Sequence, residues 1–434
     1  MSTELVVGLV AIVVMLVLIF LKVPIALSMF IPAALGITYL KGFDTFSASV
    51  ETVVWTQSFN HTLSTIPLFI LMGHLLHKGG ISTDLFDSFK KWFGNFPGGL
   101  GIATIGTSGI FAAASGSSLA NTATMGTLAA KEMIDAGYNK RIVSGSIVAG
   151  GTLGPLIPPS TLFIIYGIVT QQSIGQLLIA GVVPGILLMT LFSVLLISIG
   201  IVKPHLAPRG NIKYSVKDKL IAVKSNIPIL LIFVIVMGGM YTGVTTPTEA
   251  AAIGAVSTLV VTTLKGNFSM KLFMNSLVET LKMSGFLFAI LIMSFILNYF
   301  LTITKVSTFV LQSIGTLEVP NWVIFVLIVV IYLFLGMIMD GLAMMVITVP
   351  ILLPLLNAID LNLIWFGVIL VILIEIGMMT PPVGMNCFVL NSAVEELELN
   401  DIFKGALLFV IPMLLLIVVL YLFPEIVLYL PNNM

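Results

Sequence analysis

A run of small polar residues is the first feature of the chain that could carry chemistry. Residues 92–130 hold no charge, yet their middle reads ASGSSLANTATMG. Hydroxyl and amide oxygens are hard, neutral ligands, and hard cations take oxygen ligands. Small residues also let helices pack closely, but a cluster of this density favours binding of a cation such as Na⁺. The polar members are Ser115, Ser117, Ser118, Asn121, Thr122 and Thr124.

A proline-rich string, GPLIPPS at 154–160, follows this cluster. Proline has no backbone N–H and interrupts helices, and a broken helix in a bilayer is tolerated only where protein buries it or it lines a cavity. A break at Gly154, Ile157, Pro158 and Pro159 frees backbone carbonyls, which suit Na⁺, whereas helix N-termini suit a carboxylate. The break and the polar cluster together predict an ion-binding half-site.

The second half of the chain repeats these interruptions at an offset of 223 residues. Matching broken helices in duplicated halves point to the binding site of a secondary transporter. We therefore expect two internal repeats, each with its own half-site. The matched pairs are Pro24 and Pro247, Gly154 and Gly377, Pro158 and Pro381, and Pro159 and Pro382.

Three carboxylates of the second half need separate interpretation. Asp340 is the one charge within residues 319–359, and an ionisable residue at membrane depth is a functional-site hypothesis by default. We favour a second cation site there over a structural helix cap. Glu249 falls in the first turn after the matched proline, where a carboxylate favours a helix N-terminus, and is predicted to be structural. Glu375 could relay protons or be held by a structural partner.

The composition is that of a polytopic membrane protein. Apolar residues make up 58% of the 434 and charged residues 9%, with a mean hydropathy of +1.16, whereas a typical soluble domain is about 25% charged. The 19 basic and 19 acidic residues cancel, so no basic surface predicts a nucleic-acid partner. Cys387 is the single cysteine, which excludes an intrachain disulfide and a Cys-rich metal site. The apolar run 5–21 follows Glu4 and is predicted to be a permanent span, not a cleaved signal.

Apolar segments close to the roughly 20 residues that a span requires recur along the chain. The two nearly uncharged stretches are too long for one span each and are predicted to be re-entrant hairpins, at about 97–136 and 321–357. Broken helices are expected at about 142–170 and 361–391. The other candidate spans lie near 5–22, 24–40, 62–77, 178–201, 226–243, 247–264, 283–304 and 402–423.

The distribution of lysine and arginine predicts the orientation. With the N-terminus outside and each hairpin returning to the side it entered, 17 basic residues lie in the cytoplasm and two outside. The first hairpin then opens to the cytoplasm and the second to the exterior, so the repeats have inverted topology. We predict repeat 1 over residues 1–202, a basic cytoplasmic linker over 203–225 and repeat 2 over 226–434.

The sequence lacks the motifs of the enzymes that its composition would allow. It contains no Walker string and no His-Glu-x-x-His. GTSG at 106–109 is similar to a motif of intramembrane serine proteases, but such an enzyme needs a histidine base from another span, and we predict no enzymatic activity. No lysine or arginine lies within 92–130 or 319–359. A substrate carboxylate would therefore be held by amide N–H groups, hydroxyls and bound Na⁺.

Several strings together resemble the large membrane subunit of tripartite ATP-independent periplasmic (TRAP) transporters. They occur in order over most of the chain and are highly specific as a set. The resemblance implies the elevator-type fold of an ion transporter, with a moving domain of hairpins and broken helices on a scaffold. The strings are IPLFILMG (66–73), SGSSLANTATMG (115–126), LGPLIPPS (153–160), TPTEAAAIGA (246–255), MDGLAMMVITVPILLP (339–354) and TPPVGMNCFV (380–389).

The resemblance also implies a location, partners and a driving ion. The chain would lie in a bacterial inner membrane with its N-terminus in the periplasm. A small four-span subunit, present as a separate chain, would extend the scaffold. A periplasmic binding protein would deliver an organic acid, such as a sialic acid or a C4-dicarboxylate, and two or more Na⁺ ions would drive its uptake.

Carried onto this sequence, the resemblance implies two Na⁺ sites with the substrate between the hairpin tips. The first Na⁺ site is expected at Ser118, Asn121, Gly154, Ile157 and Pro159, and the second at Gly336, Asp340, Gly377, Thr380 and Pro382. The residues expected around the substrate are Ser115, Ser117, Thr122, Ser160, Asp340, Thr348 and Asn386.

Two other functions stay open from the sequence. One is a stand-alone Na⁺/dicarboxylate symporter of the same broad fold, and the other is a passive anion channel. Loss of uptake without a Na⁺ gradient would exclude the channel. Uptake by the chain without partner proteins would exclude the tripartite importer.

Overall fold

The computed structural model describes residues 2–210, 214–315 and 319–434, and every regular element in these ranges is helical. This confirms the expected all-α class. Among the described residues, six helical segments combine the length and apolarity needed to cross a bilayer, so the protein is a multi-pass membrane protein. The six are Thr3–Phe20, Ile174–Val202, Pro247–Leu264, Met270–Thr304, Gly341–Ala358 and Leu399–Leu422.

The first quarter of the chain departs most from the expected spans. Helix α3 was not expected, because charged residues, among them Asp44 and Glu51, interrupt the apolar pattern that predicts a span. None of its residues is buried in the structure. The segment expected to cross at 62–77 forms a helix of only 14 residues, which is too short to span a bilayer alone. That helix stops before Gly80, whose φ of +76° favours glycine. The helices are α1 (Thr3–Phe20), α2 (Ile25–Lys41), α3 (Phe43–Ser58), α4 (Thr65–Lys78) and α5 (Ile81–Phe93).

The remainder of the first half contains the two interruptions expected there. A two-residue break separates α6 from α7, and the proline string separates α8 from α9. Side chains cap the N-termini of α8 and α9. Asn139 Oδ1 accepts from the Arg141 N–H at 3.0 Å, and Ser160 Oγ accepts from the Phe163 N–H at 3.3 Å. The helices are α6 (Gly99–Ser115), α7 (Ser118–Asp135), α8 (Lys140–Thr152), α9 (Thr161–Thr170), α10 (Ile174–Ala180) and α11 (Val182–Val202).

Helix bounds in the second half recur at the offset read from the prolines. Helix α7 begins at 118 and ends at 135, and α17 begins at 341 and ends at 358, so both bounds differ by 223. The first residues of α8 and α18, at 140 and 363, also differ by 223. The opposite orientation of the halves in a bilayer stays a prediction. The second-half helices are α16 (Asn321–Gly336), α17 (Gly341–Ala358), α18 (Leu363–Met379) and α19 (Met385–Ala393).

Four long helices and two short ones make up the rest of the described second half. Helix α14 has 35 residues where a span was expected only over 283–304. Before α13, the Glu249 carboxylate accepts from the Thr246 N–H at 2.8 Å, while Thr246 Oγ1 accepts from the Glu249 N–H at 3.3 Å. This capping box confirms that Glu249 is structural. The helices are α12 (Val216–Tyr241), α13 (Pro247–Leu264), α14 (Met270–Thr304), α15 (Val306–Gly315), α20 (Leu399–Leu422) and α21 (Glu425–Asn432).

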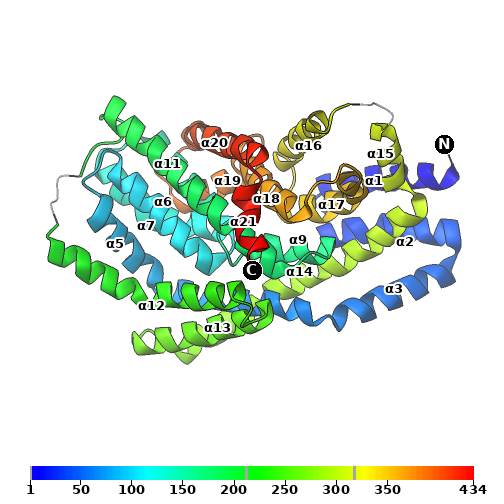
Figure 1. The fold of residues 1–434 in the computed structure, drawn as a ribbon, viewed down its shortest axis with the longest axis horizontal. Coiled ribbons are helices and arrows are strands. Elements are labelled where there is room, and N and C mark those ends of the chain that lie inside the picture. Colours follow the sequence, from blue (N-terminus) through cyan, green and yellow to red (C-terminus); the bar gives the residue numbers. More distant parts are fainter. Residues whose placement is uncertain (1, 211–213, 316–318) are drawn as a thin grey trace.

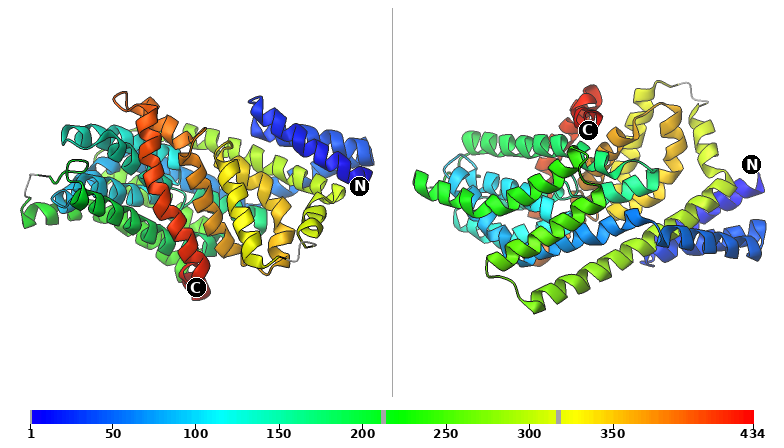
Figure 2. Two further views of the ribbon diagram at one scale, coloured as in Figure 1. Left: turned by 90° about the horizontal axis from the view of Figure 1, so that it is seen from above. Right: turned by 60° about the horizontal axis from the view of Figure 1, so that its bottom comes forward.

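The helices form two neighbouring groups (Figures 1 and 2). In the first group, α12 packs on α13, α13 on α4, and α14 on both α2 and α4. In the second group, α8 packs on α6, α7 and α20, and α18 packs on α16, α17 and α20. Figure 1 shows α12 and α13 along the lower edge and α14 leading toward α2 and α3, with the hairpins and broken helices above them.

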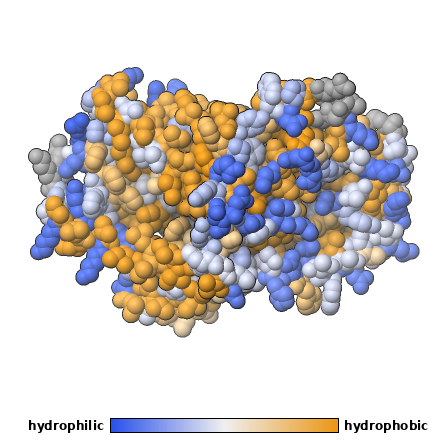
Figure 3. Space-filling model, viewed as in Figure 1, coloured by the Kyte–Doolittle hydropathy of each residue, from blue (hydrophilic) through white to orange (hydrophobic). Residues whose placement is uncertain are grey.

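Apolar side chains gather on the outside of the first group. Figure 3 shows a broad apolar surface over the region of α12 and α13. Side chains there include Leu231 and Val234 on α12, 53% and 61% exposed, and Val256 and Val260 on α13, 61% and 50% exposed. A contiguous exposed apolar surface of this kind suits contact with lipid.

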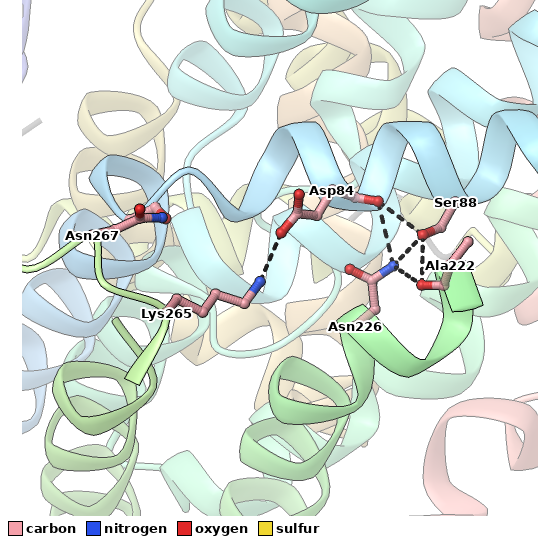
Figure 4. A network of polar contacts seen from close by, with 7 residues as sticks. Asp84, Ser88, Ala222, Asn226, Lys265 and Asn267 are labelled. Carbon is pink, nitrogen blue, oxygen red and sulfur yellow. Dashed lines mark hydrogen bonds and ion pairs between the residues drawn. The ribbon is translucent and has the colours of Figure 1, made fainter. Parts of the chain in front are cut away.

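A set of polar contacts joins α5 to α12 and to Lys265, the residue that follows α13 (Figure 4). We call it the α5–α12 network. The Asn226 side-chain nitrogen donates to Ser88 Oγ and to the Ala222 carbonyl, at 2.5 and 3.2 Å. The Ser88 hydroxyl also lies 2.8 Å from the Asp84 carbonyl oxygen. Lys265 Nζ, one residue beyond α13, lies 2.7 Å from Asp84 Oδ2. The network comprises Asp84, Ser88, Ala222, Asn226 and Lys265.

Candidate functional site

The break between α6 and α7 forms the first hairpin tip. Gly116 has φ +58°, a conformation that favours glycine, and Ser117 caps α7 by accepting from the Ala120 N–H at 3.4 Å. A Cβ at Gly116 would lie 2.9 Å from the Pro159 carbonyl oxygen, and the Thr161 hydroxyl donates to the Gly116 carbonyl at 3.2 Å. The tip therefore lies directly against the proline break.

Two glycines allow α7 to approach the end of α8. A Cβ at Gly151 would collide with Thr122 Oγ1, and a Cβ at Gly154 would lie 3.0 Å from the Ser117 carbonyl. The string VAGGTLG holds these glycines, and close approach of this kind is a recognised use of the residue. The importance of Gly151 was not predicted, because nothing in its local sequence indicates which helix comes near it.

Asn121 is held so that one of its side-chain atoms is left without a partner. Its nitrogen donates to the carbonyls of Ser108 and Gly150, both at 3.1 Å. Its Oδ1 has no hydrogen-bond partner, although the residue is fully buried. The buried Thr122 Oγ1 also lacks a partner. A buried polar oxygen costs free energy unless something satisfies it.

Backbone carbonyls in the proline break are also available. Residues 151–160 are all buried. Among the hydrogen bonds of the described residues, none uses the carbonyl oxygen of Gly154, Ile157 or Pro159 as its acceptor. Pro158 and Pro159 cannot donate, so the normal helical partners of this turn are missing. The first predicted Na⁺ site thus brings together oxygens without partners from α7 and from the break.

The second tip is built around Asp340. Its Oδ2 accepts from the N–H groups of Leu342 and Ala343 at 3.1 and 3.3 Å, so the side chain caps α17. Gly336 and Gly377 pack backbone to backbone, since a Cβ at Gly336 would lie 2.9 Å from Gly377 Cα. The Val383 N–H donates to the Met337 carbonyl at 3.2 Å. The second tip thus lies against the second break, with a carboxylate at the start of α17.

Several predicted residues of the second half and of the first break have their polar groups occupied. The Thr380 hydroxyl donates to the Ile376 or Gly377 carbonyl, at 3.0 and 3.1 Å. The Thr348 hydroxyl lies 2.5 Å from Tyr332 Oη and 2.7 Å from the Met344 carbonyl. Ser160 is fully buried as the cap of α9. The side chain of Ser115 falls outside the part of the chain that the structure describes.

Glu375 and Asn386 lie beside the first tip, which links the two half-sites. The Glu375 carboxyl, on α18, lies next to the side chains of Ser118 and Asn386 and interacts with the charge of Asp340. Ser118 and Asn386 lie within hydrogen-bonding reach of the carboxyl, but neither of its oxygens and neither polar atom of the Asn386 amide makes a well-aligned hydrogen bond. The sequence could not reveal this approach, because Ser118 and Glu375 belong to different halves of the chain.

Polar atoms without partners concentrate at this place. Among the described residues, thirteen buried side-chain nitrogen and oxygen atoms make no well-aligned hydrogen bond, and seven of them belong to five residues near the first tip and the second break. All but one of the seven are oxygens, as a hard cation requires of its ligands. The described residues contain no group of three or more His, Cys, Asp and Glu that could hold a metal ion. We call these five residues the tip cluster: Ser108, Asn121, Thr122, Glu375 and Asn386.

Ion pairs lie away from the tips. Lys90 Nζ lies 2.6 Å from Glu132 Oε2, and Arg141 Nε lies 3.0 Å from Asp401 Oδ1. Burial lowers the pKa of Lys90, but the hydrogen bond and charge of Glu132 outweigh burial and raise that pKa above its usual value. None of the ion pairs among the described residues includes Asp340 or Glu375.

Known families and proteins match nearly the whole chain. The family described as "Tripartite ATP-independent periplasmic transporter, DctM component" matches residues 12–426. The sialic acid TRAP transporter permease protein SiaT of Haemophilus influenzae (strain 86-028NP) is 31% identical over 98% of this chain and 68% of its own. The C4-dicarboxylate TRAP transporter large permease protein DctM of Pseudomonas aeruginosa is 33% identical over 88% of this chain and 89% of its own.

A solved structure shares the fold. The crystal structure of the Alcanivorax borkumensis YdaH transporter, described as having an unusual topology, superposes with a TM-score of 0.62. The match covers 87% of this chain and 88% of that one, at 15% sequence identity. At this identity the likeness concerns the fold alone.

Proposed function

Since this chain belongs to the family of DctM components of tripartite ATP-independent periplasmic transporters, we propose that it imports an organic acid together with Na⁺ across the inner membrane. The relatives are permease proteins rather than enzymes. The concentration of partnerless buried oxygens at the hairpin tips carries the proposal. These oxygens lie at two helix interruptions, where irregular backbone in a membrane protein commonly forms a binding site.

Two groups of residues would hold Na⁺. The first comprises Ser118, Asn121 Oδ1 and the carbonyls of Gly154, Ile157 and Pro159. Asn121 Oδ1 and the three carbonyl oxygens accept no hydrogen bond from the described residues. The Asn121 nitrogen is fixed by two carbonyls, so its oxygen is oriented in advance and loses little entropy on binding. Asp340 belongs to the second group, with the backbone around Gly336, Gly377, Thr380 and Pro382.

The substrate would lie between the two tips. The stretches around both tips, whose one charge is Asp340, provide no lysine or arginine, so an acid would be held by N–H groups at the start of α7, by hydroxyls and by nearby Na⁺. Ser117, Thr122 and Asn386 would contribute side chains to this site. Relatives named for sialic acid and for C4-dicarboxylates support an organic acid as the class of substrate.

Movement would involve the two groups of helices as separate parts. The group that contains α12, α13 and α14 would be the scaffold, and the hairpins and broken helices would slide against it as an elevator. Inverted repeats, with the N-terminus in the periplasm, would give the two half-sites equivalent access from opposite sides of the bilayer. Na⁺ bound at the tips would favour acid binding, and the loaded domain would then cross.

Two partners follow from the family. A small membrane subunit would extend the scaffold surface of α12 and α13, and a periplasmic binding protein would deliver the acid. Much of the choice of acid would lie in the binding protein, so this chain would be selective mainly for the carboxylate.

The decisive experiment reconstitutes the chain in proteoliposomes with its small subunit and binding protein. Uptake of labelled sialic acid and C4-dicarboxylates is measured with an inward Na⁺ gradient and with K⁺ in place of Na⁺. We expect uptake that needs all three proteins and the Na⁺ gradient. Uptake without Na⁺ would indicate a channel, and Na⁺-driven uptake by this chain alone would indicate a stand-alone symporter.

A further inference from the structure

Two neighbouring cavities lie along the inner side of α12. The first has a volume of about 170 Å³ and is enclosed by α4, α6, α11, α12 and the first proline break. The second, of about 230 Å³, lies between α12 and the facing sides of α5 and α6. Ile110 and Leu230 line both cavities, so the two adjoin along α12. We call the pair the α12 groove.

The walls of the α12 groove are apolar. Among the described residues that line the two cavities, none is charged. The polar side chains in the wall, Ser88 and Asn226, face each other and share a hydrogen bond (Figure 4). Apolar cavities of about 150 Å³ stay free of water and take up small hydrocarbons. Without an occupant, the lining side chains would lack dispersion contacts on one side, so the groove suits a hydrocarbon ligand.

The groove reaches the surface between α11 and α12. Leu230 on α12 is 39% exposed, and Ile186 on the wall formed by α11 is 50% exposed. Ile186 belongs to Ile174–Val202, a helical segment long and apolar enough to cross a bilayer. The medium beside the opening is therefore expected to be lipid rather than water. An acyl chain could enter from the bilayer and supply the contacts that the cavity walls lack.

A basic side chain lies at the far end of the groove. Trp92 lines the second cavity, and its indole N–H donates to the Lys219 carbonyl at 3.2 Å. The Lys219 ammonium lies 5.6 Å from the centre of the Trp92 ring, and none of the ion pairs among the described residues includes it. Helix α12 contains three lysines and one acidic residue, Asp218, which is used in the cap of the helix. This excess of positive charge beside an apolar groove suits an anionic lipid headgroup.

We propose that the α12 groove binds an anionic phospholipid, with an acyl chain in the two cavities and the headgroup at Lys219. The chain would reach Ile157 and Pro159 of the proline break, which line the first cavity. One wall of that cavity comes from α4 and α12 of the first group of helices, and the other from α6, α11 and the break. The lipid would therefore lie between the two groups and stabilise the arrangement observed here.

The test counts lipid molecules that stay bound to the protein. The purified chain with its small subunit is delipidated, supplied with equal amounts of dioleoyl phosphatidylglycerol and dioleoyl phosphatidylcholine, and analysed by native mass spectrometry. We expect the wild type to retain phosphatidylglycerol in preference to phosphatidylcholine. Leu230→Trp places an indole where the two cavities adjoin and should lose the retained lipid. Leu231→Trp is the matched control and should keep it, because Leu231 is 53% exposed and lines neither cavity.

A second variant tests the headgroup. A lysine near a membrane surface strengthens the binding of anionic lipid by about fivefold. The preference of Lys219→Gln for phosphatidylglycerol over phosphatidylcholine should fall by about this factor. Lys217→Gln is the control, because residues two positions apart lie on nearly opposite sides of a helix, and it should keep the preference of the wild type.

Each outcome bears on the proposal. Equal retention of phosphatidylglycerol by Leu230→Trp and Leu231→Trp would overturn it, and so would a wild type that retains no lipid or retains the two lipids equally. An unchanged preference in Lys219→Gln would overturn the placement of the headgroup. If Leu230→Trp does not fold, Ile186→Trp on the facing wall decides, with Val194→Trp, 52% exposed on the same helix, as its control. The measurement needs neither Na⁺ nor substrate, so its failure would leave the proposed function unaffected.

Discussion

The tip cluster and the α5–α12 network are both polar, but they differ in how their buried atoms are satisfied. In the network, the Asn226 side-chain nitrogen lies within hydrogen-bonding reach of three oxygens, and the Ser88 hydroxyl lies within reach of two carbonyls. Only Asn226 Oδ1 lacks a partner there. In the tip cluster, seven side-chain atoms on five residues have none.

The difference separates a structural role from a binding role. Groups that satisfy one another stabilise the contact between helices and have no capacity left for a ligand. Groups that face each other without bonding raise the free energy of the empty protein, and a ligand that satisfies them recovers that cost. The network should therefore determine stability, and the tip cluster should determine how transport depends on Na⁺.

The largest effect is expected from Gly151→Ala. The added methyl group would collide with Thr122 Oγ1 and push α7 away from α8. Overpacking of this kind costs about 1–3 kcal/mol, so Na⁺-driven uptake in proteoliposomes should fall by roughly one to two orders of magnitude. Gly285→Ala is the matched control, because no atom lies within 4 Å of the added methyl position. Equal uptake by the two variants would show that the close packing of the tip is dispensable.

The next effect is expected from Asn121→Ala. The change removes Oδ1 from the first Na⁺ site, and the half-saturating Na⁺ concentration for uptake should rise by about 10–100-fold. Asn226→Ala is the counterpart in the network, where loss of the bonds to Ser88 and two carbonyls should lower the free energy of unfolding by about 1–3 kcal/mol. Na⁺ titrations and thermal unfolding are measured on both variants. If Asn226→Ala alters Na⁺ dependence and Asn121→Ala does not, the division between the two regions is wrong.

A smaller effect is expected from Asp340→Asn, which separates two roles of one side chain. Asparagine caps helices about as well as aspartate, so the start of α17 should stay intact. The lost charge should raise the half-saturating Na⁺ concentration for uptake by about tenfold. Asp340→Ala loses the cap as well, at about 1 kcal/mol of stability. Wild-type Na⁺ dependence in Asp340→Asn would mean that Asp340 serves only as a cap.

Local chemistry made the helix breaks predictable from the sequence. Proline lacks an N–H wherever it stands, so the interruptions at 154–160 and 380–384 could be placed without knowing the fold, as could the cap at Glu249. Small polar residues without charge similarly indicated the tip at Ser117 and Ser118. Each of these inferences depends on neighbours within a few positions along the chain.

What could not be predicted depends on contacts between distant segments. The approach of Glu375 to Ser118 joins α18 to α7, and the collision that reserves position 151 for glycine depends on where α7 packs. Helix α3 escaped prediction because it is neither apolar nor buried, and the first half of α14 escaped prediction because it is too polar to resemble a span. The five members of the tip cluster can be recognised only in the structure, because only there can their polar atoms be seen to lack hydrogen-bond partners.

The smallest effect is expected from Lys265→Ala, which removes the ion pair at the end of the network. The side chains of Lys265 and Asp84 are 21% and 45% exposed, so water screens their attraction, and such pairs contribute about 0–1 kcal/mol. Thermal unfolding should therefore change little, and the half-saturating Na⁺ concentration should not change. A double-mutant cycle with Asp84→Ala isolates the coupling between the two charges. A changed Na⁺ dependence in Lys265→Ala would contradict the comparison, because the paired network would then share the ion coupling assigned to the tip cluster.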